Sequence, residues 1–398
     1  MKTNLYIMML VAVAFTTIST NLFAQKDEFK PSGKLWGYTF GDFYYKLGAD
    51  SLYNSNPIKK WGDTEFAKVK KDFIGVNIRR LYLGYDYNIA SNYTAHILLE
   101  GSDDILTSGG DRTVLIKAAN LEWKNILKRH TLTIGLSGTP CYSISEKIWG
   151  YRSIEKTIGN ARKILPANDL GIKLEGSIDT AKNFGYTLMY GTGRESKPED
   201  NRLKKYYAGI EAKFFNKQLL IAVNFDYEDQ SVEFQEQPMS KMSMEGFLGF
   251  SNSLFTIGLE GVSQIKKNYK IFDPKVVDTA STLPEDSTDV TVMGISFFVR
   301  STLIKDKLAA FARYDVFNPD IGYQKGDNTE NPYKETFTTV GIDFTPNKNV
   351  HIIPNIWFNS YTDIREKPAN YAVATNCASY YKRKPDVVAR LTFYYVFK

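Results

Sequence analysis

The chain has 398 residues, of which 43% are hydrophobic and 24% are charged, so a disordered or collagen-like protein is excluded. Aromatic residues make up 14% of the chain, whereas only 3 His and 2 Cys are present, which leaves few side chains for nucleophilic or metal chemistry. The 50 basic and 44 acidic residues give a net charge of +6, and so balanced a surface does not indicate a nucleic-acid partner.

The first 24 residues have the pattern of a secretory signal peptide. Lys2 is a short positive segment, Leu5–Phe15 is an apolar run, and a polar stretch follows Ala24. An apolar run of this length is typical of a signal peptide and too short for a membrane-spanning helix. We therefore expect residues 1–24 to be removed on export.

Hydrophobic residues alternate with polar ones along most of the remaining chain. Leu219, Ile221 and Val223 fall on one face of a segment whose other face carries Asn224 and Asp226. A period of two predicts β-strands. Sixteen strands are predicted: 34–46, 73–89, 91–101, 112–124, 130–139, 168–178, 183–192, 204–215, 218–229, 240–251, 254–263, 289–302, 306–317, 334–346, 349–361 and 385–398. The apolar phase of the second strand shifts at Arg79 and Arg80, which indicates a β-bulge.

The connections between these strands alternate in length. The predicted long ones are 47–72, 102–111, 140–167, 193–203, 230–239, 264–288, 318–333 and 362–384, and the turns between them are short. Such alternation gathers the long loops at one end of an up-and-down antiparallel barrel, as in transmembrane barrels of the outer membrane. The predicted fold class is therefore all-β, a barrel of about sixteen strands with an inward-folded third loop. A periplasmic segment is expected over 25–33 and the outer-membrane barrel over 34–398.

A barrel of this size encloses a lumen too wide for wall side chains to fill, so charged side chains on its inner face stay solvated. Alternation assigns acidic and basic residues to this lining. The predicted wall residues are Arg80, Lys173, Lys213, Arg313, Arg390, Glu175, Asp226 and Asp315.

Several stretches resemble the phosphate-selective porin O/P family in its Bacteroidetes-type form. They are Arg79-Arg80, Gly135–Pro140, Glu146, Trp149–Ser153, Asp169–Gly176 and Arg313–Asp315. The resemblance covers nearly the whole mature chain in layout but only patches in sequence. It implies a sixteen-stranded trimeric porin that passes small anions, phosphate-like ones among them, through a constriction made by the third loop.

The third long loop, residues 140–167, carries most of the charge that could narrow such a channel. Its acidic residues are Glu146 and Glu155, and its predicted constriction residues are Lys147, Arg152, Lys156, Arg162 and Lys163, giving a net charge of +3. Crowded cations in a narrow neck select anions. Arg152 and Arg162 are the strongest candidates. The complete set of residues that alternation assigns to the inner face, however, holds six cations and nine carboxylates, so the predicted wall is mildly acidic and general diffusion of polar solutes is an equal expectation.

No enzyme, metal or cofactor is predicted. The chain lacks the sequence patterns of zinc proteases, of serine hydrolases and of phosphate-binding loops. His96, His130 and His351 fall on separate predicted strands and share no motif. Cys141 and Cys377 lie in two long loops on the same side, so that a disulfide and two free thiols both fit the sequence.

The expected partners are small hydrophilic or anionic solutes, outer-membrane lipid with lipopolysaccharide, and two further copies in a homotrimer, with no nucleic acid. The alternative function is a non-conducting barrel that acts as an adhesin or surface scaffold. Its contact surfaces would be the loops 47–72, 264–288 and 362–384, which are polar and contain tyrosines.

Overall fold

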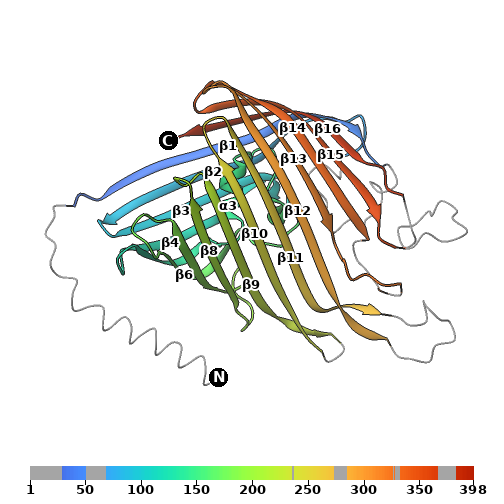
Figure 1. The fold of residues 1–398 in the computed structure, drawn as a ribbon, viewed down its shortest axis with the longest axis horizontal. Helices are drawn as coiled ribbons and strands as arrows, with labels where there is room; N and C mark the ends of the chain where they lie inside the picture. The colour runs from blue at the N-terminus through green and yellow to red at the C-terminus, as the bar shows by residue number, and fades with distance from the viewer. Residues whose placement is uncertain are drawn as a thin grey trace, which may run out of the picture.

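The strands close into a single antiparallel barrel (Figure 1). The computed structural model describes residues 29–50, 69–234, 237–272, 285–325, 327, 332–365 and 382–398. Each strand pairs with its neighbour in the sequence, and β1 pairs with β16 to close the ring. The predicted fold class is therefore confirmed. The predicted signal peptide, 1–24, and Cys377 lie outside the described residues.

The strands in chain order are β1 (Ser32–Gly48), β2 (Ile74–Ala90), β3 (Tyr93–Leu106), β4 (Arg112–Lys124), β5 (His130–Gly138), β6 (Asn168–Ser177), β7 (Phe184–Gly191), β8 (Lys205–Phe214), β9 (Leu219–Phe234), β10 (Gln237–Ser251), β11 (Phe255–Phe272), β12 (Asp286–Ile304), β13 (Leu308–Asn318), β14 (Tyr333–Asn347), β15 (Val350–Asp363) and β16 (Asp386–Phe397). Two short helices, α3 (Ser143–Trp149) and α4 (Ile158–Ala161), lie between β5 and β6.

Three of the predicted long connections are wrong in length, and in the first of them β3 takes up residues 102–106 of the predicted loop 102–111. Residues 230–239 belong largely to β9 and β10, and β11 and β12 extend by several residues into the predicted loop 264–288. The added part of β11 is polar, and Lys270 there still pairs with Thr288 of β12. Beyond the apolar belt both strand faces can meet water, so the alternation that marks a strand disappears although the backbone pairing continues.

The predicted β-bulge in the second strand is confirmed. Phe40 pairs with Arg80 and Gly41 pairs with Ile78, so Arg79 has no partner in the β1–β2 ladder. Both Arg79 and Arg80 are buried in consequence of this extra residue. The bulge thus turns two successive arginines toward the interior, where strict alternation would allow one.

The outer face of the barrel is apolar and exposed. Ile97, Leu188, Leu248, Phe297 and Ile342 are each at least two-fifths exposed, and their neighbours along each strand point inward. Such a belt matches the hydrocarbon that surrounds a transmembrane barrel. Among the described residues, no helix has the length and apolar character needed to span a membrane.

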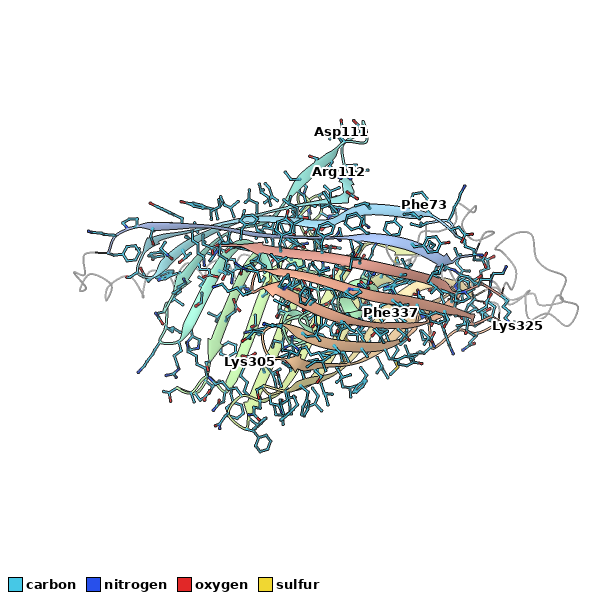
Figure 2. The ribbon with its side chains drawn as sticks, turned by 90° about the horizontal axis from the view of Figure 1, so that it is seen from above. Phe73, Asp111, Arg112, Lys305, Lys325 and Phe337 are labelled. Carbon is cyan, nitrogen blue, oxygen red and sulfur yellow. The ribbon has the colours of Figure 1, made fainter. Side chains whose placement is uncertain are left out.

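The connections between consecutive strands lie alternately at the two ends of the barrel. Figure 2 shows Lys305, in the short connection between β12 and β13, and Lys325, after β13, toward opposite ends of the strands. Asp111 and Arg112 lie on the β3–β4 hairpin, which projects from the body of the barrel (Figure 2).

Candidate functional site

The third loop, residues 139–167, folds into the barrel and packs on the inner wall. Trp149 is fully buried, with its ring centroid 5.1 Å from that of Phe298 and 5.9 Å from that of Phe311. Ile158 and Leu165 join a second apolar cluster with Val262 of β11. Burying a side chain of this size stabilises the docked loop by about 1.5–3 kcal/mol. The loop is therefore part of the core.

The first helix of the loop is held by polar contacts as well. Glu245 of β10 accepts hydrogen bonds from the backbone N–H of Tyr142 at 2.9 Å and from Ser145 Oγ at 3.0 Å. At its other end, α3 stops at Gly150, whose φ of 72° is a left-handed conformation that favours glycine. The hydrogen bonds to Glu245 and the turn at Gly150 together fix the path of the chain inside the lumen.

A set of wall arginines clamps the middle of the loop. Arg79 donates to the carbonyls of Ser153 at 2.7 Å and Ile154 at 3.0 Å, and Arg390 also reaches the Ile154 carbonyl, at 3.2 Å. Arg313 donates to the carbonyl of Lys156 at 2.6 Å. These arginines come from β2, β16 and β13, so the clamp connects the loop to strands on both sides of the barrel closure.

Glu155 lies at the centre of this clamp. Its carboxylate accepts hydrogen bonds from Trp357 Nε1 at 3.2 Å and from the backbone N–H of Lys156 at 2.9 Å. Burial alone would raise the pKa of Glu155, but the positive charges of the three clamping arginines and the Lys156 N–H lower it to about 2. The carboxylate is therefore ionised and compensates part of the arginine charge.

On the side of β1–β4, charged groups of the loop and of the wall come together in what we call the charge cluster: Arg80, Glu100, Lys117, Glu146 and Arg152. Glu100 lies 3.0 Å from Arg80 Nε and 3.0 Å from Lys117 Nζ. On the loop, Arg152 Nε lies 3.0 Å from Glu146. The cluster holds three cations and two carboxylates, a local charge of +1.

Arg152 interacts electrostatically with residues of the barrel wall. Burial alone would lower its pKa, but Tyr82, Glu146, Tyr142 and Tyr38 together raise the pKa of Arg152 above its usual value. Tyr38 and Tyr82 belong to β1 and β2, and Arg152 also contributes to the field at Glu100 of β3. The side chain is one-fifth exposed, so it remains in contact with solvent. Arg152 thus keeps its charge at the loop–wall boundary.

The other predicted constriction residues have different surroundings. Arg162 is buried, 2.8 Å from Glu335 of β14 and over the ring of Phe317, so its position is that of an anchor. Lys147 and Lys163 are exposed, and Lys156 is half-buried. The structure therefore brings Arg152 alone among the five into the charge cluster.

The predicted wall residues divide into covered and open groups. Arg313, Arg390, Asp226 and Asp315 are almost fully buried on the inner wall. Arg313 and Asp315 form a bidentate pair, and Asp226 pairs with Lys205 at 2.9 Å. These four residues stabilise the packed interior, which differs from the expected solvated lining because the third loop covers that part of the wall.

The open group lies on β6 and β8. Lys173 pairs with Glu175 at 2.9 Å, and Lys213 pairs with Glu211 at 2.7 Å, with all four side chains partly exposed. Arg80, the remaining predicted wall residue, is buried and belongs to the charge cluster. Sequence reasoning did not select Lys117, Tyr38 or Tyr82. Lys117 has no partner in the β3–β4 register, so a phase shift in that strand was the signal that could have found it.

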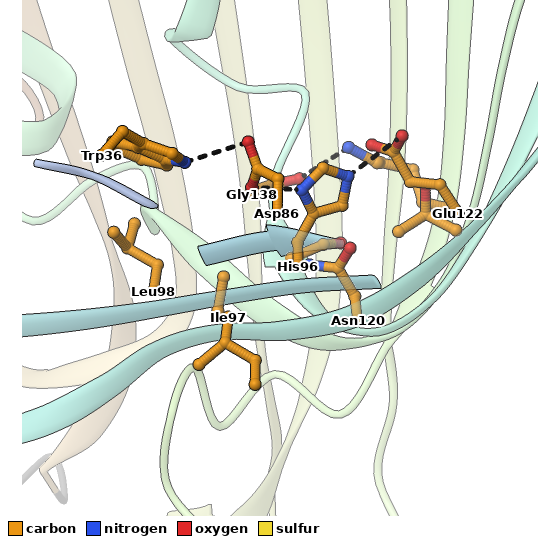
Figure 3. Close-up of a pocket in the computed structure, with 12 residues that line it drawn as sticks. Trp36, Asp86, His96, Ile97, Leu98, Asn120, Glu122 and Gly138 are labelled. Atoms are coloured by element: carbon orange, nitrogen blue, oxygen red, sulfur yellow. Dashed lines mark hydrogen bonds and ion pairs between the residues drawn. The ribbon is translucent and has the colours of Figure 1, made fainter. Parts of the chain in front are cut away.

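A pocket of about 210 Å³, which we call the wall pocket, lies on the wall formed by β1–β6. Its lining includes Trp36, Asp86, His96 and Glu122 (Figure 3). Lys173 also lines it. His96 lies 2.8 Å from Asp86 and 3.2 Å from Glu122. Among the described residues no group of His, Cys, Asp and Glu has the arrangement of a metal site.

Cys141 is fully buried at the start of the third loop, in the cluster with Met189 and Tyr207. Burial raises the pKa of its thiol well above the usual value. The disulfide with Cys377 stays a hypothesis, because that residue lies outside the described part of the chain.

Solved barrels share this architecture at low sequence identity. The anion-selective porin from Comamonas acidovorans matches with a TM-score of 0.58 and 10% identity over 92% of this chain and 100% of its own. The outer membrane channel DcaP of Acinetobacter baumannii matches with a TM-score of 0.63 and 12% identity over 94% and 99% of the two chains. OmpF of Salmonella typhi, in complex with daunomycin, matches with a TM-score of 0.54 and 11% identity over 92% of this chain and 97% of its own.

The chain has the fold of the porins. No protein-family model matches it, and no curated protein matches it either. The porin-type barrel, with a helical loop after the fifth strand, is therefore established at the level of fold.

Proposed function

We propose that this protein is an outer-membrane porin that lets small polar and anionic solutes diffuse passively through a water-filled channel. The observation that carries the proposal is the position of the third loop, which covers one part of the inner wall and leaves open the part of β1–β6 that lines the wall pocket. The channel then runs between the loop and these strands. Its constriction is the charge cluster, where Arg152 and Glu146 of the loop face Arg80, Glu100 and Lys117 of the wall.

The charge of the constriction favours a weak preference for anions. Three cations and two carboxylates leave a local charge of +1, and fixed charges act strongly where a pore is narrow. Each carboxylate is itself paired with a cation, so the excess is small. The resemblance to the phosphate-selective porin O/P family and the name of the Comamonas porin agree with anion passage. A barrel with this apolar exterior would lie in outer-membrane lipid, and a homotrimer is proposed from the same resemblance.

Single-channel recording tests the proposal. The purified, refolded protein is added to a planar bilayer, with a heat-denatured sample as the control. Stepwise currents are expected from the folded sample alone. A folded barrel that gives no current would contradict the porin proposal and favour the adhesin or scaffold.

A further inference from the structure

Aromatic rings form a row across the inner faces of β1, β2 and β16. The Trp36 and Tyr38 rings are nearly parallel, at 13°, with centroids 6.5 Å apart. The centroid of the Tyr38 ring lies 4.6 Å from that of Tyr82 and 6.0 Å from that of Tyr394. The row therefore leads from the wall pocket toward the charge cluster, where Arg152 has Tyr38 and Tyr82 as electrostatic neighbours.

The Trp36 ring packs against Gly84 of the neighbouring strand β2. Gly84 is its cross-strand partner, and a Cβ at Gly84 would lie 2.3 Å from the indole. Only glycine lets the ring lie flat on β2 at this point. The indole Nε1 donates to Asp86 at 2.9 Å, which fixes the orientation of the ring (Figure 3).

The pocket beside Trp36 offers hydrogen-bonding groups. Asn120, Glu122 and Lys173 line it together with Asp86 and His96. Thr133 also lines it and is only 2% exposed, yet its hydroxyl has no hydrogen-bond partner among the described residues. A buried hydroxyl without a partner costs about 1–3 kcal/mol, so this position favours a ligand or water that supplies one.

We propose that the wall pocket and the aromatic row form a binding site for neutral saccharides built of pyranose rings, a proposal that rests on the porin function above. A pyranose has a face of C–H groups that suits an aromatic ring and a rim of hydroxyls that suits Asn120, Glu122 and Thr133. The partly exposed rings of Tyr38 and Tyr394 would then receive the sugar as it moves toward the constriction, with the buried Tyr82 ring packed against Tyr38.

The charges around the pocket favour a neutral occupant. Asp86 and Glu122 are the acidic groups, but Asp86 accepts from Trp36 and His96, and Glu122 lies 3.8 Å from Lys124. Lys173 at the lining is paired with Glu175. Both carboxylates of the lining already have partners, so an organic cation would find no unpaired carboxylate here, and an inorganic anion would make no use of the ring faces.

Block of the single-channel current by added solutes tests the site. Maltotriose should block the wild-type channel in a saturable manner, whereas mannitol, which has hydroxyls but no ring face, and choline should not. Trp36→Leu should weaken maltotriose block about fivefold. Gly84→Ala, which displaces the indole, and Thr133→Val, which removes the unpaired hydroxyl, should each weaken it to a similar extent. Tyr85→Leu is the matched control, because Tyr85 is an exposed outward aromatic on the same strand as Gly84.

Each other outcome overturns the saccharide site. Equal block by mannitol would mean that the ring faces play no part, and stronger block by choline would assign the pocket to organic cations. Open channels without maltotriose block would reject the site but leave the porin function intact. If the folded barrel conducts no current, titration of its tryptophan fluorescence with maltotriose, compared with Trp36→Leu, still decides whether the sugar binds.

Discussion

The indole Nε1 of Trp357 in β15 donates a hydrogen bond of 3.2 Å to the carboxylate of Glu155 in the third loop. This contact joins the loop to a strand 202 positions further along the chain. Together with the arginine clamp, it holds the loop against β13–β16 and β2. The loop therefore has a fixed position, and the open part of the lumen lies along the stretches of β1–β6 that line the wall pocket.

Removal of the Arg152 charge should change ion selectivity. In Arg152→Ala the charge cluster loses its loop cation, so the reversal potential under a KCl gradient should move toward cation preference. Glu146→Gln should move it in the opposite direction. Lys128→Ala is the control, because Lys128 is an exposed lysine in a short turn. The same shift in all three variants would show that the channel does not pass the charge cluster.

Removal of the Arg162 charge should affect stability and leave selectivity unchanged. Arg162→Met breaks the buried ion pair between Arg162 and Glu335, which should destabilise the docked loop by about 3–5 kcal/mol. The double variant Arg162→Met with Glu335→Gln should recover most of this loss. Limited proteolysis of the folded barrel, with cleavage within 139–167 as the readout, measures the effect. A changed reversal potential in the double variant would instead make Arg162 a pore charge.

Loss of the clamp should loosen the loop. Arg79→Met removes the donors to the Ser153 and Ile154 carbonyls. The Ile154 carbonyl keeps its hydrogen bond from Arg390, whereas loss of the donor to the buried Ser153 carbonyl costs about 1–3 kcal/mol. We expect larger open-channel current noise than in wild type. Arg129→Met, at a short turn of the barrel, serves as the matched arginine control. Equal noise in wild type and Arg79→Met would contradict the clamp.

Acid should release the loop through Glu155. Because the pKa of Glu155 falls from 4.5 to about 2 on folding, its contribution to docking is complete above pH 4.5 and is lost as the pH falls to about 2. The lost contribution amounts to about 3 kcal/mol. Current noise should therefore rise between pH 4.5 and pH 2 in wild type. In Glu155→Gln the noise should be high throughout, and a wild-type-like acid transition in this variant would assign the effect to another group.

Much of the barrel could be predicted from alternation alone, because lipid on one side and the lumen on the other impose a period of two. The bulge at Arg79 was visible as a phase shift. Alternation does not predict the ends of β9–β12 that extend into residues 230–239 and 264–288, because polar residues occupy both strand faces there. Lys270 of β11 is an example, and its Nζ lies 2.7 Å from the Asp320 carboxylate.

The candidate site was harder to predict, since it depends on how the third loop lies. Alternation places Arg80 and Arg313 alike on the inner face. The loop covers Arg313 and leaves Arg80 at the constriction, a difference set by contacts of Trp149, Ile154 and Ile158 with strands far away in the sequence. Similarly, Arg152 and Arg162 carry the same charge, and only the docked loop separates a boundary residue from an anchor.

Site-directed thiol modification tests most directly where the channel runs. In a background of Cys141→Ala and Cys377→Ser, Lys117→Cys places a thiol in the charge cluster, and Ser296→Cys places one on the inner face of β12, where the side chain is 1% exposed. A negatively charged methanethiosulfonate added during single-channel recording should reduce the current through Lys117→Cys and leave Ser296→Cys unchanged. Modification that blocks Ser296→Cys but spares Lys117→Cys would contradict a channel between the third loop and β1–β6.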